Sequence, residues 1–433
     1  MVVRRFTQKD AAGHWNRRKP KAFDTLSNTN RVVSEFSHMD ARVTFKPANG
    51  RRPILLCFSH LRWDFVYQRP QHLLSRAACV YDVAFMEEPV TENVQAPVLR
   101  GRRSRENVTV LTPILPAGYS EAQAINAQRK LLQAFIESRQ PEFLIFWYYA
   151  PMALAFTTDW VPEVTVYDCM DELSTFKFAP PSLKMYEREL FDRADVVFTG
   201  GHSLYEAKRS YHKNIHAFPS SIDAHHFAKA RSAKVHPQDV AHLKGPKLGF
   251  FGVIDERMDL DFLAEMARAR PDWSFVMIGP VVKIHPECLP SLPNIHWIGG
   301  RAYNDLPDYI ASWDVGIMPF AMNEATRFIS PTKTPEFLAA GCPVISTPVA
   351  DVVSSYGVSG LVEIASTPDE AIRCAERLMN MNRASWLAAV DQSLEGRSWD
   401  NTWANMNAHI VACAIQAGHD IIVGEQITGA ARV

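Results

Sequence analysis

The sequence predicts an α/β protein built from two doubly wound, Rossmann-like domains that face each other across a cleft. Twelve short apolar runs, most of four to six residues, lack the polar alternation of half-exposed strands and suit strands buried on both faces. Segments with helical periodicity separate these runs, and strand–helix alternation implies parallel sheets. A polar stretch around residues 228–240 divides the runs six and six, and twelve strands are too many for one ordinary sheet.

The first predicted domain spans residues 52–235, and its strands are expected at Ile54–Phe58, Val83–Met86, Val108–Leu111, Phe143–Trp147, Val164–Tyr167 and Val196–Thr199. The second spans residues 236–397, with strands expected at Leu248–Phe251, Phe275–Ile278, Ile295–Ile298, Val315–Met318, Val344–Ser346 and Leu361–Ile364. Residues 398–433 are expected to form a helix that returns to the first domain, followed by a tail. In such sheets ligands bind outside the carboxyl ends of the strands, so the residues after each run are the candidates for function.

The composition is that of a globular enzyme, with 47% apolar and 21% charged residues. It excludes a disordered, collagen-like or coiled-coil chain. No stretch approaches the roughly 20 apolar residues that span a bilayer, and the polar, basic first thirty residues do not resemble a secretory signal. The seven cysteines are scattered and odd in number, which favours a reducing cytoplasm over a disulfide scaffold.

Charge is distributed unevenly along the chain. Residues 1–52 carry 12 Lys and Arg against 4 Asp and Glu, a balance of +8, whereas the remainder carries 34 against 43, a balance of −9. We expect residues 1–51 to be a basic, flexible arm. Such an arm can contact an anionic membrane, and a solvated tail is the simpler alternative.

The densest candidate for chemistry lies between Phe328 and Pro348. Thr334 can cap a helix there, Pro335 suits its first position and Gly341 suits its end. Glu336 then falls in the first turn, where an acid can simply compensate the helix dipole. Alternatively, the helix start and Lys333 bind a phosphate while Glu336 accepts hydrogen bonds from a ribose diol.

The segment Pro331–Val344 resembles the donor-site signature of retaining GT-B glycosyltransferases (glycosyltransferase family 4, or group 1), and the resemblance extends over most of residues 52–400. Four further segments resemble a bacterial subgroup linked to surface polysaccharides, including teichuronic-acid-type transferases: Trp63–His72, Tyr167–Glu172, Phe198–Ser203 and Pro219–Asp223. The resemblance implies a GT-B fold whose C-terminal domain binds a nucleotide-sugar, UDP- or GDP-linked, with Glu336 holding the ribose.

Two features depart from the family pattern. Phe328 stands eight positions before Glu336, where the family often has a second glutamate, and the usual Gly-Arg…Lys pair is absent from the loop Gly252–Asp259. Arg257 is the expected replacement cation, and Glu324 can replace the missing carboxylate. We therefore expect catalytic roles for Arg257, Lys333 and Glu324, and donor binding by Gly252, Arg257, Gly279, Arg327, Thr332, Lys333, Thr334 and Glu336.

The first domain is expected to bind the acceptor, through residues that follow its strands. The candidates are His60, Arg62 and Trp63 after the first strand, Gln68 and Arg69 at the next helix, Tyr148 after the fourth strand and Asp171 after the fifth. Aromatic rings stack on the apolar faces of sugars, and polar side chains pair with their hydroxyls. Interdomain packing is an equal alternative for Trp63, and helix capping is the alternative for one of the two acids at positions 171 and 172.

Other chemistries find less support in the sequence. Asp259 and Asp261 form an Asp-x-Asp pattern, but they open an amphipathic helix, where acids serve the helix dipole, so no metal site is predicted. No Gly-x-Gly-x-x-Gly follows the first strand, and no Gly-x-Ser-x-Gly suggests a serine hydrolase.

The predicted function is sugar transfer from a nucleotide diphosphate donor to a glycan or lipid-linked acceptor in surface polysaccharide synthesis, retaining, and without a cofactor or a metal. No nucleic-acid partner is expected. The expected location is cytoplasmic, with peripheral contact at the inner face of the plasma membrane as an option. A GT-B-shaped sugar-nucleotide epimerase and a non-catalytic scaffold of a polysaccharide complex are the alternatives.

Overall fold

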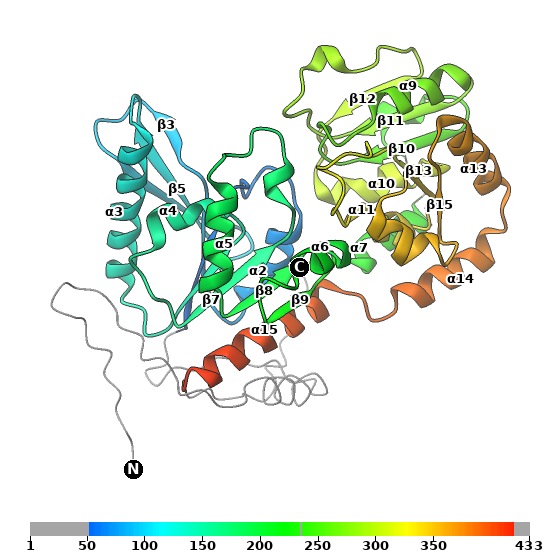
Figure 1. Cartoon of the computed structure of the whole chain (residues 1–433). Helices are drawn as coiled ribbons and strands as arrows, with labels where there is room; N and C mark the ends of the chain where they lie inside the picture. Colours follow the sequence, from blue (N-terminus) through cyan, green and yellow to red (C-terminus); the bar gives the residue numbers. More distant parts are fainter. Residues whose placement is uncertain (1–51, 234–235, 420–433) are drawn as a thin grey trace.

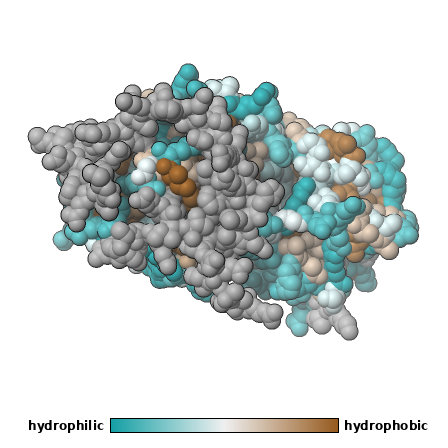
Figure 2. All heavy atoms as spheres, turned by 90° about the horizontal axis from the view of Figure 1, so that it is seen from below, coloured by the Kyte–Doolittle hydropathy of each residue, from teal (hydrophilic) through white to brown (hydrophobic). Residues whose placement is uncertain are grey.

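A computed structural model describes residues 52–233 and 236–419 as two sheet-centred α/β units (Figure 1). The basic arm predicted at residues 1–51 lies outside the described residues, as does most of the predicted tail. In the part that the structure describes, no helix is long and apolar enough to cross a membrane. Seen from below, hydrophobic patches on the described surface are small and interspersed with hydrophilic residues (Figure 2).

The N-terminal sheet has the order β3-β5-β2-β1-β6-β7-β8-β9, with β4 paired to β5 outside this path. Its strands are β1 (Ile54–Phe58), β2 (Asp82–Met86), β3 (Val90–Glu92), β4 (Val98–Arg103), β5 (Thr109–Pro116), β6 (Leu144–Tyr148), β7 (Val164–Cys169), β8 (Val196–Thr199) and β9 (Ile215–Ala217). All pairings are parallel except that of β4 with β5. The central strands β1 and β6 are buried along their whole length because hydrophobic clusters cover both faces.

Helices follow the strands of this unit as expected for parallel crossovers. They are α2 (Arg69–Ala77), α3 (Glu121–Arg139), α4 (Leu154–Thr157), α5 (Leu183–Arg193) and α6 (His202–Lys208), with short turns η1 (Pro151–Ala153) and η2 (Leu173–Thr175). The segment between the two sheets contains α7 (Ala224–Ala228), η3 (Lys229–Ser232) and α8 (Gln238–Ala241).

The C-terminal sheet is entirely parallel, in the order β12-β11-β10-β13-β14-β15. Its strands are β10 (Lys247–Phe251), β11 (Ser274–Ile278), β12 (Ile295–Gly299), β13 (Val315–Met318), β14 (Val344–Ser346) and β15 (Val362–Ile364). Its helices are α9 (Leu260–Ala269), α10 (Leu306–Ile310), α11 (Lys333–Ala339), α12 (Ala350–Val352), α13 (Pro368–Asn380) and α14 (Arg383–Leu394), with turns η4 (Pro286–Cys288), η5 (Tyr303–Asp305) and η6 (Val353–Gly357).

The last described helix, α15 (Trp399–Gln416), leaves the C-terminal unit and packs against α2, β7 and β8 of the N-terminal one. Figure 1 shows this helix in red, beneath the N-terminal sheet. Buried Trp399, Trp403, Met406 and Ile410 join the N-terminal hydrophobic core. The two units are therefore tied together by α15 as well as by the segment between the sheets.

The predicted class, two doubly wound domains, is confirmed. Each of the twelve predicted runs forms a strand, with boundaries that shift by a few residues at most except at the run Val108–Leu111, whose strand extends to Pro116. The sequence reading missed β3, β4 and β9, which enlarge the N-terminal sheet from six strands to nine.

Candidate functional site

Two glycines shape the floor of the candidate site. Gly252 follows β10 with φ +139°, and Gly279 follows β11 with φ +147°, a region that favours glycine. A Cβ atom on Gly279 would lie 1.7 Å from the carbonyl oxygen of Gly252, and one on Gly252 would lie 2.0 Å from Cε of Lys333. The absence of side chains thus lets the two loops meet and lets Lys333 cross over them.

Helix α11 supplies the next wall of the site, and it begins earlier than predicted. Thr332 is its N-cap residue, Lys333 is its first residue and Pro335 is its third, so the predicted cap at Thr334 is wrong. The Thr334 side chain is buried with Oγ1 3.5 Å from the sulfur of Met318, so it is directed into the core instead of back over the helix start. Gly341 follows the helix with φ +74°, as expected for a helix end.

Lys333 and Glu336 are two oppositely ionisable side chains of the site that make no direct contact with each other or with other described polar groups. Among the described residues, neither side chain makes a hydrogen bond or an ion pair, and the Lys333 ammonium lies 5.7 Å from the centroid of the Phe250 ring. Burial lowers the pKa of Lys333 and raises that of Glu336, while the opposite charge of each partner acts against both shifts. Because neither buried side chain has a hydrogen-bond partner among the described residues, the pair is ready to bind a ligand that carries both an anion and hydroxyl groups.

Arg257 lies close to this pair but is already engaged. Its Nη2 and Nε bind the Asp255 carboxylate at 2.7 and 3.0 Å, and its guanidinium lies 5.3 Å from the Phe176 ring centroid. Nη1 makes no hydrogen bond within the described residues. Asp255 is only 3% exposed, so it fixes the guanidinium in place and leaves one edge of it for a ligand.

The N-terminal domain approaches the site through the loop after β7. The ring of Phe176 also lies 4.8 Å from the ammonium of Lys283, and the backbone N–H of Lys177 donates to Glu256 Oε1 at 3.3 Å. Burial raises the pKa of Asp171 to about 6, against the opposing effect of nearby cations, of which Arg257 is the strongest. The cations Arg257 and Lys283 belong to the C-terminal domain, so the two domains meet at Asp171.

His60, which follows β1, lies within the electrostatic influence of Lys283. Burial lowers the pKa of its imidazole to about 4, and the charge of Lys283 acts in the same direction. Its Nδ1 is buried and has no hydrogen-bond partner among the described residues. His60 is therefore neutral near pH 7 and retains a ring nitrogen that can bind a polar ligand.

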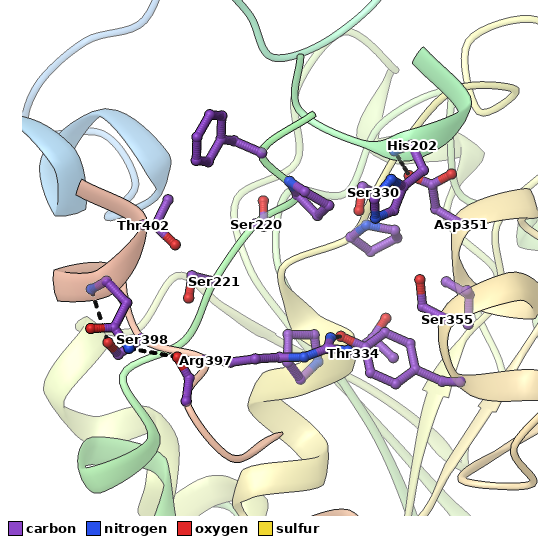
Figure 3. Close-up of a pocket in the computed structure, with 18 of the residues that line it drawn as sticks. His202, Ser220, Ser221, Ser330, Thr334, Asp351, Ser355, Arg397, Ser398 and Thr402 are labelled. Carbon is purple, nitrogen blue, oxygen red and sulfur yellow. Dashed lines mark hydrogen bonds between the residues drawn. The ribbon is translucent and has the colours of Figure 1, made fainter. Parts of the chain in front are cut away.

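A cavity of about 290 Å³ lies between the domains on another side of α11 (Figure 3). It is lined by Thr334 and Pro335 but not by Lys333 or Glu336. Several hydroxyl groups line its wall, among them those of Ser220, Ser221, Ser330, Ser355 and Thr402. At one side of the cavity Asp351 accepts a hydrogen bond from the backbone N–H of His202, so the cavity wall includes a direct contact between the domains (Figure 3).

Comparison with known proteins identifies the second sheet unit. Residues 245–381 match the family model described as glycosyl transferases group 1. The chain contains a glycosyl transferases group 1 domain. This group 1 domain runs from β10 through α13 and includes Gly252, Gly279, Arg257, Lys333 and Glu336.

A relative and two solved structures extend the likeness beyond the group 1 domain. TuaH of Bacillus subtilis (strain 168), which is named as a candidate teichuronic acid biosynthesis glycosyltransferase, is 26% identical over 266 residues, covering 57% of this chain and 66% of the relative, just under two thirds. The E. coli trehalose-6-phosphate protein bound with UDP-2-fluoro glucose superposes with a TM-score of 0.62 at 13% identity, over 83% of this chain and 99% of that one. The catalytic domain of starch synthase IV from Arabidopsis thaliana, bound to ADP and acarbose, gives 0.56 at 9% identity, over 84% and 100%. The fold is the GT-B fold.

Two predicted residues of the group 1 domain lie apart from the buried pair. Glu324 and Arg327 occupy the loop between β13 and α11, with side chains 74% and 62% exposed, and bind each other at 3.6 Å. Solvent screens such exposed charges, so their expected donor role lacks the desolvation that Lys333 and Glu336 have. Thr332 is half-buried at the start of α11, and its side chain does not cap the helix.

Several residues predicted to bind the acceptor are instead structural. Trp63 is 4% exposed and packs its ring edge-on against Phe85, 5.1 Å between centroids, so it lies in the core of the N-terminal unit and not in a packing contact between the two sheet units. Tyr148 is buried on the other face of the sheet, where its hydroxyl donates to Thr157 at 2.9 Å. Neither ring is exposed for contact with a sugar, because hydrophobic burial places both in the core.

The polar residues of the same segment are also committed to the fold. Arg69 is 2% exposed and binds both oxygens of Asp168 at 2.8 and 3.0 Å, so its predicted contact with an acceptor is wrong. Gln68 closes a capping box at the start of α2. Arg62 remains partly exposed, but its Nη1 donates to Glu87 Oε2 at 3.3 Å and to a neighbouring backbone carbonyl.

Sequence reasoning overlooked residues whose partners are remote in the chain. Asp168 neutralises Arg69, Asp351 caps α6, and Phe176 covers Arg257. The Gly-Gly-His-Ser segment at the start of α6 contains one signal for the contact with Asp351. A Cβ atom at position 201 would collide with the Asp351 carboxylate, so this position requires glycine. Asp259 caps α9 by accepting from the N–H of Phe262 at 2.9 Å, as its position predicted. Among the described residues, no cluster of three or more His, Cys, Asp or Glu side chains could hold a metal.

Proposed function

We propose that this protein is a glycosyltransferase that moves a sugar from a UDP- or GDP-linked donor to a glycan or lipid-linked acceptor, with retention of configuration. The observation that carries the proposal is the buried Lys333–Glu336 pair at the start of α11, above the Gly252–Gly279 floor, whose two side chains have no hydrogen-bond partner within the described part of the chain. A nucleoside diphosphate offers both groups that this pair lacks: a diphosphate for the ammonium and a ribose diol for the carboxylate.

The leaving diphosphate is stabilised by two cations in this scheme. Lys333 and the free edge of Arg257 bind its oxygens, aided by the backbone N–H groups at the start of α11. The bond between the anomeric carbon and the diphosphate oxygen breaks, and the acceptor hydroxyl attacks the same face of the sugar. Its proton passes to the departing diphosphate, so no protein nucleophile is required and the nucleoside diphosphate is the second product.

The acceptor is placed on the side of the N-terminal domain, at His60 and Asp171. Both follow strands of that domain, and both are close to cations of the group 1 domain. The Phe176 contact with Arg257 and Lys283 closes the site from this side, which excludes water and suppresses donor hydrolysis. Trp63, Arg69 and Tyr148 have no part in this site.

Metal independence belongs to the same proposal. Two cations, Lys333 and Arg257, supply the charge that a divalent ion would otherwise bring to a diphosphate. Asp259, the one acid of the Asp-x-Asp pattern with a described role, is engaged as a helix cap.

Calorimetric titration with UDP, GDP and ADP tests the donor site directly. Glu336→Ala should weaken the preferred nucleoside diphosphate by about 1–3 kcal/mol, the loss expected for charge-assisted hydrogen bonds. Lys333→Ala should weaken the diphosphate more than the free nucleoside. Glu324→Ala is the matched control, because its exposed carboxylate should contribute little. Unchanged affinity in both site variants would contradict the proposal.

We further propose a role in surface polysaccharide synthesis, supported by the likeness to TuaH, with peripheral docking on an anionic membrane through residues 1–51. Each surface Lys or Arg near anionic lipid contributes about 1 kcal/mol, and salt screens this attraction. Deleting residues 1–51 should therefore reduce co-sedimentation with phosphatidylglycerol vesicles at low salt and leave donor affinity intact. Equal sedimentation of both proteins would reduce the arm to a solvated tail.

A further inference from the structure

Tyr303 stands at the centre of an aromatic cluster that joins the two domains. It begins η5, shortly after β12 of the group 1 domain. Its ring stacks on His226 of α7, 4.5 Å between centroids and 10° from parallel, and lies 4.9 Å from the ring of Tyr67. Tyr67 belongs to the N-terminal domain, and His226 belongs to the segment that connects the two domains. The Tyr303 ring therefore packs against both of these parts of the chain.

The cluster continues into the N-terminal domain through His72 of α2. The His72 ring lies 5.5 Å from that of Tyr303 and stacks on Trp399 at 4.6 Å and 7°. Trp399 begins α15, the helix that crosses between the domains. Stacked and edge-on rings at these separations each add a modest directional attraction, so the position of Tyr303 is fixed from several sides.

The hydroxyl of Tyr303 is a buried polar group that lacks a hydrogen bond among the described residues. A buried hydroxyl without a partner is rare and costs about 1–3 kcal/mol. Burial and the carboxylates of Glu336 and Asp223 raise the pKa of this phenol, so it keeps its proton and remains a donor.

The unsatisfied hydroxyl belongs to the neighbourhood of Glu336. Tyr303 stacks on His226 of α7, and α7 packs against α11, the helix that carries Glu336. Tyr303 also packs against the hydrophobic cluster that contains Phe337, the residue next to Glu336. Tyr303 and helix α11 thus both pack against α7, and neither the Tyr303 hydroxyl nor the Glu336 carboxylate has a hydrogen-bond partner among the described residues.

We propose that Tyr303 is a further donor-binding residue, whose hydroxyl donates a hydrogen bond to the ribose diol that Glu336 accepts from. A diol needs an acceptor for its protons and can itself accept a proton, so a carboxylate and a phenol are complementary to it. Because the Tyr303 ring touches Tyr67 and His72, ribose binding is linked to the contact between the domains. This inference rests on the proposed function, and the variants below separate the two.

Calorimetry with UDP and 2′,3′-dideoxy-UDP tests the inference, with the guanine pair in their place if wild type prefers GDP. Tyr303→Phe keeps the ring stack and removes only the hydroxyl. It should weaken UDP about 3- to 10-fold, as expected for one neutral hydrogen bond. It should leave dideoxy-UDP unchanged, so the preference for UDP over dideoxy-UDP falls by the same factor. A purely structural role would weaken both nucleotides equally.

Two comparisons complete the design. Tyr309→Phe is the matched control, because it removes the hydroxyl of a second tyrosine of the group 1 domain that already binds Asp239 at 2.9 Å. Tyr303→Leu removes the stack as well and should lower affinity for both nucleotides. If Tyr303→Phe binds both nucleotides as wild type does while Glu336→Ala still loses UDP, the inference is overturned and the proposed function stands. If Glu336→Ala and Lys333→Ala also bind UDP normally, the donor site itself is wrong.

Discussion

Asp351 of the group 1 domain caps helix α6 of the N-terminal domain at His202. Its Oδ2 accepts from the backbone N–H of His202 and its Oδ1 accepts from that of Ser203, both at 2.9 Å. A Cβ on Gly201 would lie 2.2 Å from Oδ2, so glycine allows this close approach. A helix cap supplied by another domain links the stability of one domain to the position of the other.

Removing this cap should loosen the link between the domains. Asp351→Ala is expected to lower the free energy of unfolding by about 1–2 kcal/mol, the range for a lost N-cap, measured by urea denaturation. Asp369→Ala is the matched control, because Asp369 is an exposed acid in the first turn of α13, which Thr367 already caps. Equal losses in the two variants would show that Asp351 does not hold the domains together.

Substitutions in the Arg69–Asp168 pair test whether Arg69 stabilises the fold or binds the acceptor. Both side chains are buried, at 3% and 0% exposure, so Arg69→Met leaves the Asp168 carboxylate without its partner. That variant should lose about 3–5 kcal/mol of unfolding free energy. Adding Asp168→Asn should restore part of the loss, because an amide is cheaper to bury than a charge. A stable Arg69→Met variant with weakened acceptor binding would instead support the original prediction.

The strands that could be predicted from the sequence are more deeply buried than the strands that could not. The predicted runs are apolar because both faces of their strands are buried, as at Ile54–Phe58. Strand β4 reads Val-Leu-Arg-Gly-Arg-Arg, is mostly exposed and pairs antiparallel with β5 alone, so its sequence has no apolar signal. Strands β3 (Val-Thr-Glu) and β9 (Ile-His-Ala) are mostly half-buried or exposed, so they lack the apolar run that marks the equally short, fully buried β14.

Whether a candidate site residue could be predicted depends on whether its partners are close to it in the sequence. Lys333 and Glu336 could be proposed from the sequence because a helix start and two oppositely charged residues beside it are local in sequence. Arg69 was misread because its partner Asp168 lies 99 residues away, and nothing in one sequence pairs them. From the sequence, Trp63 is expected to contact a sugar or to pack between the domains, and only the tertiary structure shows it in the N-terminal core against Phe85.

The Asp-x-Asp pattern predicts different results for stability and for metal dependence. Asp259→Ala removes the cap of α9 and should lower the free energy of unfolding by about 1 kcal/mol. Turnover with the preferred nucleotide-sugar should persist after exhaustive EDTA treatment in both wild type and this variant. Activity lost in EDTA and restored by Mn²⁺ or Mg²⁺ would reopen Asp259 and Asp261 as metal ligands.

Asp171 should lower the free energy of unfolding as the pH rises, whereas an acid in a salt bridge raises it. Its pKa in the folded protein is about 6, above the reference value of 3.8, so folding favours the protonated carboxyl. This contribution is complete below the reference pKa and is lost as the pH rises through about 6. A shift of about two units corresponds to about 3 kcal/mol, which the partial exposure of the side chain reduces to about 1–2 kcal/mol.

Asp171→Asn, which stays neutral, should therefore match wild type in unfolding free energy at pH 4 and exceed it by about 1–2 kcal/mol at pH 8. Urea denaturation at both values measures the difference. Asp192→Asn on α5 is the control, because Asp192 is exposed and should show the same stability as wild type at either pH. A gain for Asp171→Asn that is equal at pH 4 and pH 8 would mean that the carboxylate is not disfavoured by the fold. A gain confined to pH 8 would identify Asp171 as an acid kept at the domain boundary at the expense of stability, as expected for a residue retained for function.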